Sequence, residues 1–247
     1  DYNNRIAAIT LPEATNPIEY GYDTSGMRVS VANGLTTTLY PNKGFNTDGQ
    51  TVQKHIFAGD GLTATIKGTG LDASMSVAHT DHLGSTAAVT NSNGDIEEVL
   101  DYHSFGEISF NSSTTNTLEQ RKYIGHEYDV DTGLSYMEAR YYNPSIGRFL
   151  SQDPAFWQLS GARLAVMLSD PQMQNSYSYA RNNPLNLVDP DGQMPQWLEK
   201  RVVAVGDWGN RLYENNSTAR FLMDNPELPA IIGSAPLDIA LVAGGAS

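Results

Sequence analysis

The chain has 247 residues, no cysteine, and 28 acidic against 15 basic side chains, which give a formal net charge of -13. Because non-specific nucleic-acid binding depends mainly on Lys and Arg contacts with phosphates, this charge balance argues against that function. The lack of cysteine excludes disulfide cross-links, zinc ribbons and thiol chemistry, and no apolar run reaches the ~20 residues that a membrane-spanning helix needs.

Residues 1–150 are predicted to form many short strands joined by tight turns. Between the turns polar and apolar side chains alternate, so that Leu62, Ala64 and Ile66 are expected on one face of a strand and Thr63, Thr65 and Lys67 on the other. Gly and Asn tolerate the positive φ that hairpin turns require. Such turn sequences recur at Asp23–Gly26, Asn33–Gly34, Asp48–Gly49, Gly59–Gly61, Asn93–Gly94 and Asp131–Gly133.

A loose repeat runs through the same region. Tyr22-Asp23 is followed by Gly26, Tyr128-Asp129 is followed by Gly133, and Asp101-Tyr102 precedes Phe105-Gly106. Reuse of one strand-turn-strand unit indicates hairpins that bury their apolar faces against each other. Tyrosines and turns are also common in any β protein, which is the alternative explanation for these units.

The composition changes after residue 155. Residues 161–168 are predicted to form a short helix that ends at Asp170-Pro171. From Trp197 to Leu212 apolar residues recur at spacings of three and four, which predicts an amphipathic helix that either lines a shell or packs as a surface helix. The tail over 228–247 is apolar but contains Asp238 and is too short to span a bilayer comfortably.

Two passages carry a specific resemblance to a known family. The first comprises His79–Thr86, Asn93-Gly94 and Tyr102–Glu107. The second comprises Tyr123–Asp129, Thr132–Pro144, Gly147–Pro154, Asn175–Asn183 and Asp189–Gly192. Together they resemble the RHS/YD-repeat family at its C-terminal RHS-associated core, weakly from residue 20 and densely from residue 75 to residue 193.

The resemblance implies an all-β fold in which a spiral of hairpins forms a hollow shell that a plug closes at one end. It implies shell strands over residues 1–74, a core and plug with an autoprotease site over 75–193, and the start of a variable toxin region, with short helices, over 194–247. The family includes the autocleaving shells of bacterial polymorphic, type VI and toxin-complex toxins, and the animal teneurins. Because a chain of this length is too short to enclose a toxin domain, more shell is expected upstream or in a separate chain.

The resemblance also implies an aspartyl autoprotease that cuts the chain once, just after the Asp-Pro-x-Gly motif. Peptide hydrolysis by carboxylates needs one ionised group to take a proton from water and one protonated group to donate to the carbonyl. The family motifs assign these roles to Asp153 and Asp189, with Arg140 as the third member of the site. We predict cleavage between Gln193 and Met194, where a turn presents the bond as an intramolecular substrate.

Each of these residues also has an ordinary structural explanation. Asp189–Gly192 matches a type I turn, Asp153 is a suitable strand terminator, and Arg140 is a suitable partner for a plain salt bridge. The departures from the family pattern are Asn143 in place of Asp, Gln193 in place of Leu, and an insert over residues 156–174.

The sequence predicts no cofactor and no metal. His79 and His82 lie three apart, but a metal site would need a third ligand and rigid spacing. The expected partners are the chain's own C-terminal toxin segment, the remaining upstream shell, and a secretion apparatus, chaperone or immunity protein, with no nucleic acid bound through the shell. The protein is expected to be made in the cytoplasm and then secreted or delivered into a target cell.

Two other functions are compatible with a β-rich chain of this kind. One is a non-catalytic structural or adhesive scaffold, as in teneurin-like surface proteins. The other is a carbohydrate-active β enzyme, which would need two acids across an open groove.

Overall fold

The computed structural model describes residues 4–12, 14–34, 36–59, 61–113, 119–158, 171–172 and 174–193. The chain divides into two compact units, one of residues 1–159 and 167–196 and the other of residues 160–166 and 197–247. The helices predicted at 161–168 and 197–212 and the tail after residue 228 lie outside the described residues. Within the described ranges, no helix combines the length and apolarity that a bilayer crossing requires.

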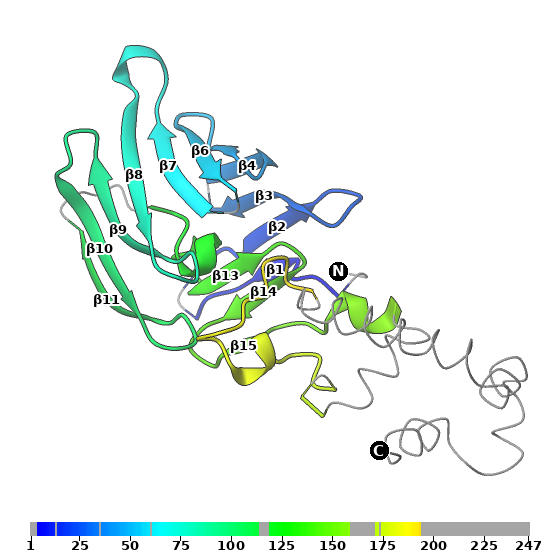
Figure 1. Cartoon of the computed structure of the whole chain (residues 1–247). Helices are drawn as coiled ribbons and strands as arrows, with labels where there is room; N and C mark the ends of the chain where they lie inside the picture. The colour runs from blue at the N-terminus through cyan, green and yellow to red at the C-terminus, as the bar shows by residue number, and fades with distance from the viewer. Residues whose placement is uncertain are drawn as a thin grey trace, which may run out of the picture. The chain divides into compact units, whose positions relative to one another are not determined.

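Two antiparallel sheets make up the described part of the chain (Figure 1), and in both of them every strand pairs with its neighbours in sequence. The eleven-stranded sheet contains β1 (Ala8–Ile9), β2 (Ile18–Tyr22), β3 (Arg28–Asn33), β4 (Thr36–Asn42), β5 (Phe45–Thr47), β6 (Val52–Ala58), β7 (Gly61–Lys67), β8 (Ser74–Thr80), β9 (Thr86–Asn91), β10 (Ile96–Tyr102) and β11 (Ile108–Ser113). The four-stranded sheet contains β12 (Glu127–Asp129), β13 (Leu134–Met137), β14 (Arg140–Asn143) and β15 (Arg148–Phe149). This succession of hairpins confirms the predicted all-β fold.

Four hairpin loops share one hydrogen-bond pattern, and two of them belong to the sequence repeat, at Tyr22–Gly26 and Asp101–Gly106. The third repeat unit, Tyr128–Gly133, differs, since the Gly133 N–H donates to the Asp129 carbonyl at 2.8 Å. The four loops span residues 23–27, 81–85, 91–95 and 103–107, and in each the first N–H donates to the fifth carbonyl while the fourth residue donates back to the first carbonyl. The fourth residue is always a glycine with φ between +85° and +94°. In the first three loops the side-chain oxygen of the leading Asp or Asn accepts two further backbone N–H bonds, so the Asp/Asn-to-Gly spacing specifies the loop.

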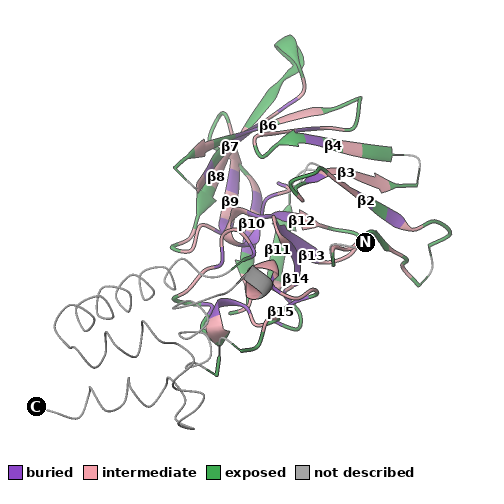
Figure 2. Cartoon of the chain, turned by 90° about the vertical axis from the view of Figure 1, so that its right-hand side faces the viewer, coloured by how far each residue is buried: buried purple, intermediate pink, exposed green. Residues whose placement is uncertain are grey.

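Two apolar clusters attach the small sheet to its surroundings, and buried stretches appear on both sheets (Figure 2). The first cluster joins β2 to β13 and β14 through Ile18, Tyr20, Leu134, Tyr136 and Tyr141. The second is built on Tyr123, Met137, Tyr142, Phe149, Tyr179 and Ala180. Because Tyr142 and Tyr179 are both fully buried with ring centroids 4.6 Å apart, the segment after residue 175 is fixed to the small sheet.

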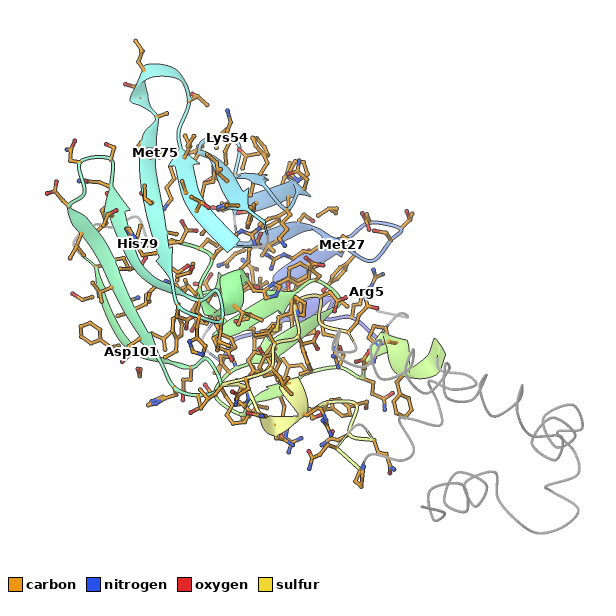
Figure 3. All side chains as sticks on the ribbon, in the orientation of Figure 1. Arg5, Met27, Lys54, Met75, His79 and Asp101 are labelled. Atoms are coloured by element: carbon orange, nitrogen blue, oxygen red, sulfur yellow. The ribbon has the colours of Figure 1, made fainter. Side chains whose placement is uncertain are left out.

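The interior is polar to a degree that the alternation of side chains did not predict. On β7 Leu62 and Ala64 are buried, as expected for one face, but Thr65 and Lys67 are buried as well. Side chains of both sheets fill the space between them (Figure 3). The interior contains buried ion pairs, such as the contact of Lys122 Nζ with Glu98 Oε1 at 2.8 Å. On β7, buried side chains therefore point to both faces, although Thr63 is exposed.

A buried histidine in this polar layer makes the stability depend on pH. The ring of His55 lies 3.0 Å from Thr65 Oγ1 and 3.1 Å from the Asn46 side-chain nitrogen. Burial, with the positive charge of Arg121, lowers the pKa of His55 from 6.5 to about 4. We expect the free energy of unfolding to fall as pH drops from 6.5 towards 4, by at most ~3 kcal/mol, because only the unfolded chain takes up the proton in that window.

Denaturant unfolding of the wild type and of His55→Gln at pH 7 and pH 4.5 tests this expectation. The stability advantage of the wild type should shrink at the lower pH, because the variant has no ring to titrate. An advantage of equal size at both pH values would contradict the assignment of a neutral buried ring.

Candidate functional site

Arg140 lies at the start of β14, directly after a tight turn. Met137 of β13 pairs with Arg140, so Glu138 and Ala139 alone form the turn, and Glu138 takes a φ of +52°. The Arg140 side chain is buried, and its Cζ lies 3.5 Å from the centre of the Phe149 ring on β15. The hairpin and this ring contact together fix the direction of the guanidinium group.

The guanidinium of Arg140 brings the two predicted aspartates together. Its Nη2 lies 3.0 Å from Asp153 Oδ2 and 3.2 Å from Asp189 Oδ2. Its Nη1 donates to the Ser176 carbonyl at 2.8 Å, and its Nε donates to the Gly192 carbonyl. Asp153 precedes the short η3 helix (Pro154–Gln158), and Asp189 follows η4 (Ala180–Asn182), so three separate segments meet at one side chain.

The backbone of Gln193 is held by the same group of residues. Its N–H donates to Asp189 Oδ1 and to Asp191 Oδ1, in both cases at 3.1 Å. Its carbonyl oxygen lies 3.4 Å from Arg140 Nη2. Gln193, on the N-terminal side of the predicted cut, thus contacts two of the three predicted site residues, Arg140 and Asp189, but not Asp153. Met194 lies outside the described residues.

The site concentrates negative charge around a single cation. Burial raises the pKa of Asp153 above its usual range, although Arg140 opposes this shift. Burial raises the pKa of Asp189 well above its usual range, and the charges of Asp191 and Asp153 act in the same direction against Arg140. Burial also lowers the pKa of Arg140, a shift that the two aspartates oppose. These directions favour retention of a proton on Asp189.

The turn from Asp189 to Gln193 is seated on the β13–β14 hairpin. The Ala139 N–H donates to the Asp191 carbonyl at 3.2 Å, and the His126 ring hydrogen-bonds the Pro190 carbonyl. Gly192 has a φ of +64° and approaches so closely that a Cβ at this position would lie 2.1 Å from the Met137 carbonyl oxygen. The Asp189–Gly192 segment therefore serves both as a turn and as a closely packed part of the site.

A cavity of about 490 Å³ lies beside Gln193. Its lining includes Gln152 and Pro154, the two neighbours of Asp153, and also Arg5 and Met27, which lie close to each other in Figure 3. The cavity gives a small molecule such as water a place next to the Gln193 backbone. Over the described ranges, no cluster of three or more His, Asp or Glu side chains has an arrangement suited to a metal ion.

The departures from the family pattern leave this geometry in place. Asn143 Oδ1 accepts the N–H of Ser145 at 3.0 Å, which is a turn contact that an Asp would also make. Most of the insert lies outside the described residues, yet Asp153 before it and Asp189 after it contact the same nitrogen of Arg140. Within the described part of the chain, no hydrogen bond joins Asp153 directly to Asp189, and the guanidinium stands between them.

Sequence reasoning missed two contributors to this site. Asp191 occupies the variable position of the Asp-Pro-x-Gly motif, where its acidic character two residues from Asp189 was the available signal. His126 was assigned to a structural motif, and its contact with Pro190 joins segments too far apart in sequence for any local pattern to reveal.

The chain is similar in sequence to parts of bacterial toxin proteins. The tRNA nuclease WapA of Bacillus subtilis is 30% identical over 207 residues, which cover 80% of this chain and 8% of the relative. Toxin subunit YenC2 of Yersinia entomophaga is 37% identical over 105 residues, which cover 42% of this chain and 9% of the relative. The fold is similar to that in a Tc holotoxin pore of Photorhabdus luminescens, with a TM-score of 0.57 at 22% identity over 76% of this chain and 9% of that chain.

These matches agree with the motifs on which the resemblance rests. The chain spans less than a tenth of the length of each of these proteins. The teneurin YD-shell family matches residues 77–185, which include β9 to β15 and the Arg140 hairpin. The predicted resemblance is confirmed, since this region of the chain matches the teneurin YD-shell family.

Proposed function

We propose that this chain is the closing end of a toxin shell and that it releases its C-terminal segment by cutting its own backbone once between Gln193 and Met194. The observation that carries the proposal is the grip on Gln193, whose N–H is held by Asp189 and Asp191 while its carbonyl faces Arg140. Contacts of an Asp with the N–H groups two and four residues on are ordinary in turns, but a plain turn would not need a buried cation that pairs with both Asp153 and Asp189.

The roles of the side chains follow from their charges and contacts. Asp153 is the general base, since its pKa is raised less strongly than that of Asp189 and it pairs directly with Arg140. Asp189 is the general acid, because burial and two negative neighbours favour its protonated form. Arg140 withdraws electrons from the Gln193 carbonyl and keeps Asp153 in position.

The reaction is a hydrolysis in two steps. Asp153 takes a proton from water as the water oxygen bonds to the Gln193 carbonyl carbon, and Asp189 gives its proton to the carbonyl oxygen. The resulting tetrahedral diol then collapses, so that the bond to the Met194 nitrogen breaks, this nitrogen receives the proton from Asp153, and a hydroxyl proton returns to Asp189. Because substrate and site are one chain, a single turnover at high effective concentration is sufficient.

The wider role is inferred from the similar proteins. WapA is a tRNA nuclease, and YenC2 is a toxin subunit. We propose that the shell to which this chain belongs holds a toxin that starts within residues 194–247, that further shell strands lie upstream, and that the assembly is secreted or delivered into a target cell.

The self-cleavage is tested on a denaturing gel and by intact-mass measurement. We expect the 26.9 kDa chain to appear as fragments of about 21 and about 6 kDa. Asp153→Asn and Asp189→Asn should each slow the cut by about 10³-fold or more, because each removes one member of the acid and base pair. The control Asp101→Asn, at an exposed position of β10 (Figure 3), should cut like the wild type.

A scaffold without catalytic activity is the second candidate, and the match to the teneurin YD-shell family favours it. Under this alternative Arg140, Asp153 and Asp189 form a structural ion cluster. The wild-type chain would then show its full mass after prolonged incubation, and a cut that persists in either Asn variant would remove that residue from the mechanism.

A further inference from the structure

Asp191 is placed to take part in cleavage beyond its role as a turn residue. Its Oδ1 accepts the Gln193 N–H at the same 3.1 Å as Asp189 Oδ1 does, so the two carboxyl groups converge on one hydrogen. The two carboxyl groups are therefore neighbours, and Asp191 contributes to the raised pKa of Asp189. Its backbone carbonyl is fixed by the Ala139 N–H, which holds Asp191 in register with the β13–β14 hairpin.

We propose that Asp191 is a positioning residue for the cut: together with Asp189 it holds the Gln193 N–H, and its negative charge beside Asp189 favours the protonated acid that gives its proton to the Gln193 carbonyl oxygen. This inference rests on the proposed self-cleavage for its rate measurement, although its structural part does not depend on it. Two carboxyl groups in contact are stable only when they share a proton. Asp191 therefore supplies Asp189 with the neighbour that keeps it an acid.

Few other groups around Asp189 could keep its carboxyl group protonated. Arg140 faces it from β14 and favours the ionised form, and Asp153 faces it from the far side of the guanidinium. The Tyr179 hydroxyl group is close enough to feel its charge, and His126 reaches only the Pro190 carbonyl. Within the described residues, Asp191 is the carboxyl group that shares the Gln193 N–H with Asp189.

The first experiment compares pH profiles of self-cleavage for the wild type and Asp191→Asn. Asn retains the Oδ1 that accepts the Gln193 N–H, but it removes the charge and presents an N–H₂ that stabilises ionised Asp189. Both changes make Asp189 lose its proton more easily. We expect the alkaline limb of the rate profile to move to lower pH by about 1 unit. Superimposable profiles would overturn the proposal.

A second measurement decides the question independently of the cut. Carboxyl ¹³C NMR follows the titration of Asp189 in the Asp153→Asn chain and in Asp153→Asn/Asp191→Asn, with Asp189→Asn providing the assignment. The midpoint for Asp189 should be lower by about 1 unit in the doubly substituted chain, and equal midpoints would overturn the proposal. Failure of the proposed function has a different signature, namely a wild-type chain that stays intact or Asn variants at residues 153 and 189 that still cut.

Discussion

Alanine in place of Gly192 is expected to stop self-cleavage while both sheets stay folded. A Cβ at this position would lie 2.1 Å from the Met137 carbonyl oxygen and 3.2 Å from the Arg140 nitrogen, both of them backbone atoms of a hairpin. Met137 is fully buried, so the hairpin has no room to retreat. The turn must therefore lift away, and the Gln193 backbone and the Asp189 carboxyl group then lose their contacts with Arg140. Loss of this alignment should cost at least about 10³-fold in cleavage rate.

A matched control separates the steric clash from the backbone strain. Gly94 also has a positive φ, +89°, but a Cβ there would meet no atom within 4 Å. Gly94→Ala therefore carries a similar left-handed strain of roughly 1–2 kcal/mol without a collision. It should lower stability slightly and cut at close to the wild-type rate. Circular dichroism and a cleavage time course are measured on both variants. A Gly192→Ala chain that cuts at the wild-type rate would contradict the inference that the close contact of Gly192 with Met137 aligns the cut.

The turns and the catalytic candidates could be predicted because their information is local. An Asp or Asn three residues before a Gly specifies the loop at Asp23–Gly26 and again at Asn91–Gly94, whatever the rest of the chain does. The Asp-Pro-x-Gly motif similarly marks Asp189. The family motifs supplied what spacing alone could not, namely that Asp153 and Arg140 reach the same place.

The composition of the interior could not be predicted because it depends on partners that are distant in sequence. Alternation assumes that the polar face of a strand meets water, and Lys67 on β7 contradicts that assumption. Arg28 is paired across roughly a hundred residues with Glu127 and Asp129. Only the fold shows that these charges neutralise one another, and no periodicity in the sequence carries that information. The same limit applied to Asp191, whose role depends on the position of the β13–β14 hairpin.

Methionine in place of Arg28 is expected to lower the free energy of unfolding by about 3–5 kcal/mol, because it leaves the buried Asp129 without its cation and removes one of the two cations that contact Glu127. The Arg28 side chain on β3 has no exposed surface. Its Nη1 lies 3.1 Å from Asp129 Oδ1 and its Nη2 contacts Glu127. Burial opposes its charge, but Asp129 and Glu127 raise the pKa of Arg28 well above its ordinary value. The rings of Tyr40 and Tyr136 each lie 4.4 Å from its Cζ.

Denaturant unfolding at pH 7 measures the effect of Arg28→Met, with Lys54→Met as the control. Lys54 is an exposed cation on β6 (Figure 3), and its loss should change stability by no more than about 0.5 kcal/mol. Adding Asp129→Asn to Arg28→Met should recover part of the lost stability, because it removes the carboxylate left without a cation, whereas Glu127 keeps its contact with Arg121 at 2.9 Å. If Arg28→Met stayed within about 1 kcal/mol of the wild type, the small sheet would be held by its tyrosine clusters, and the buried charges would serve only to set its register against β3.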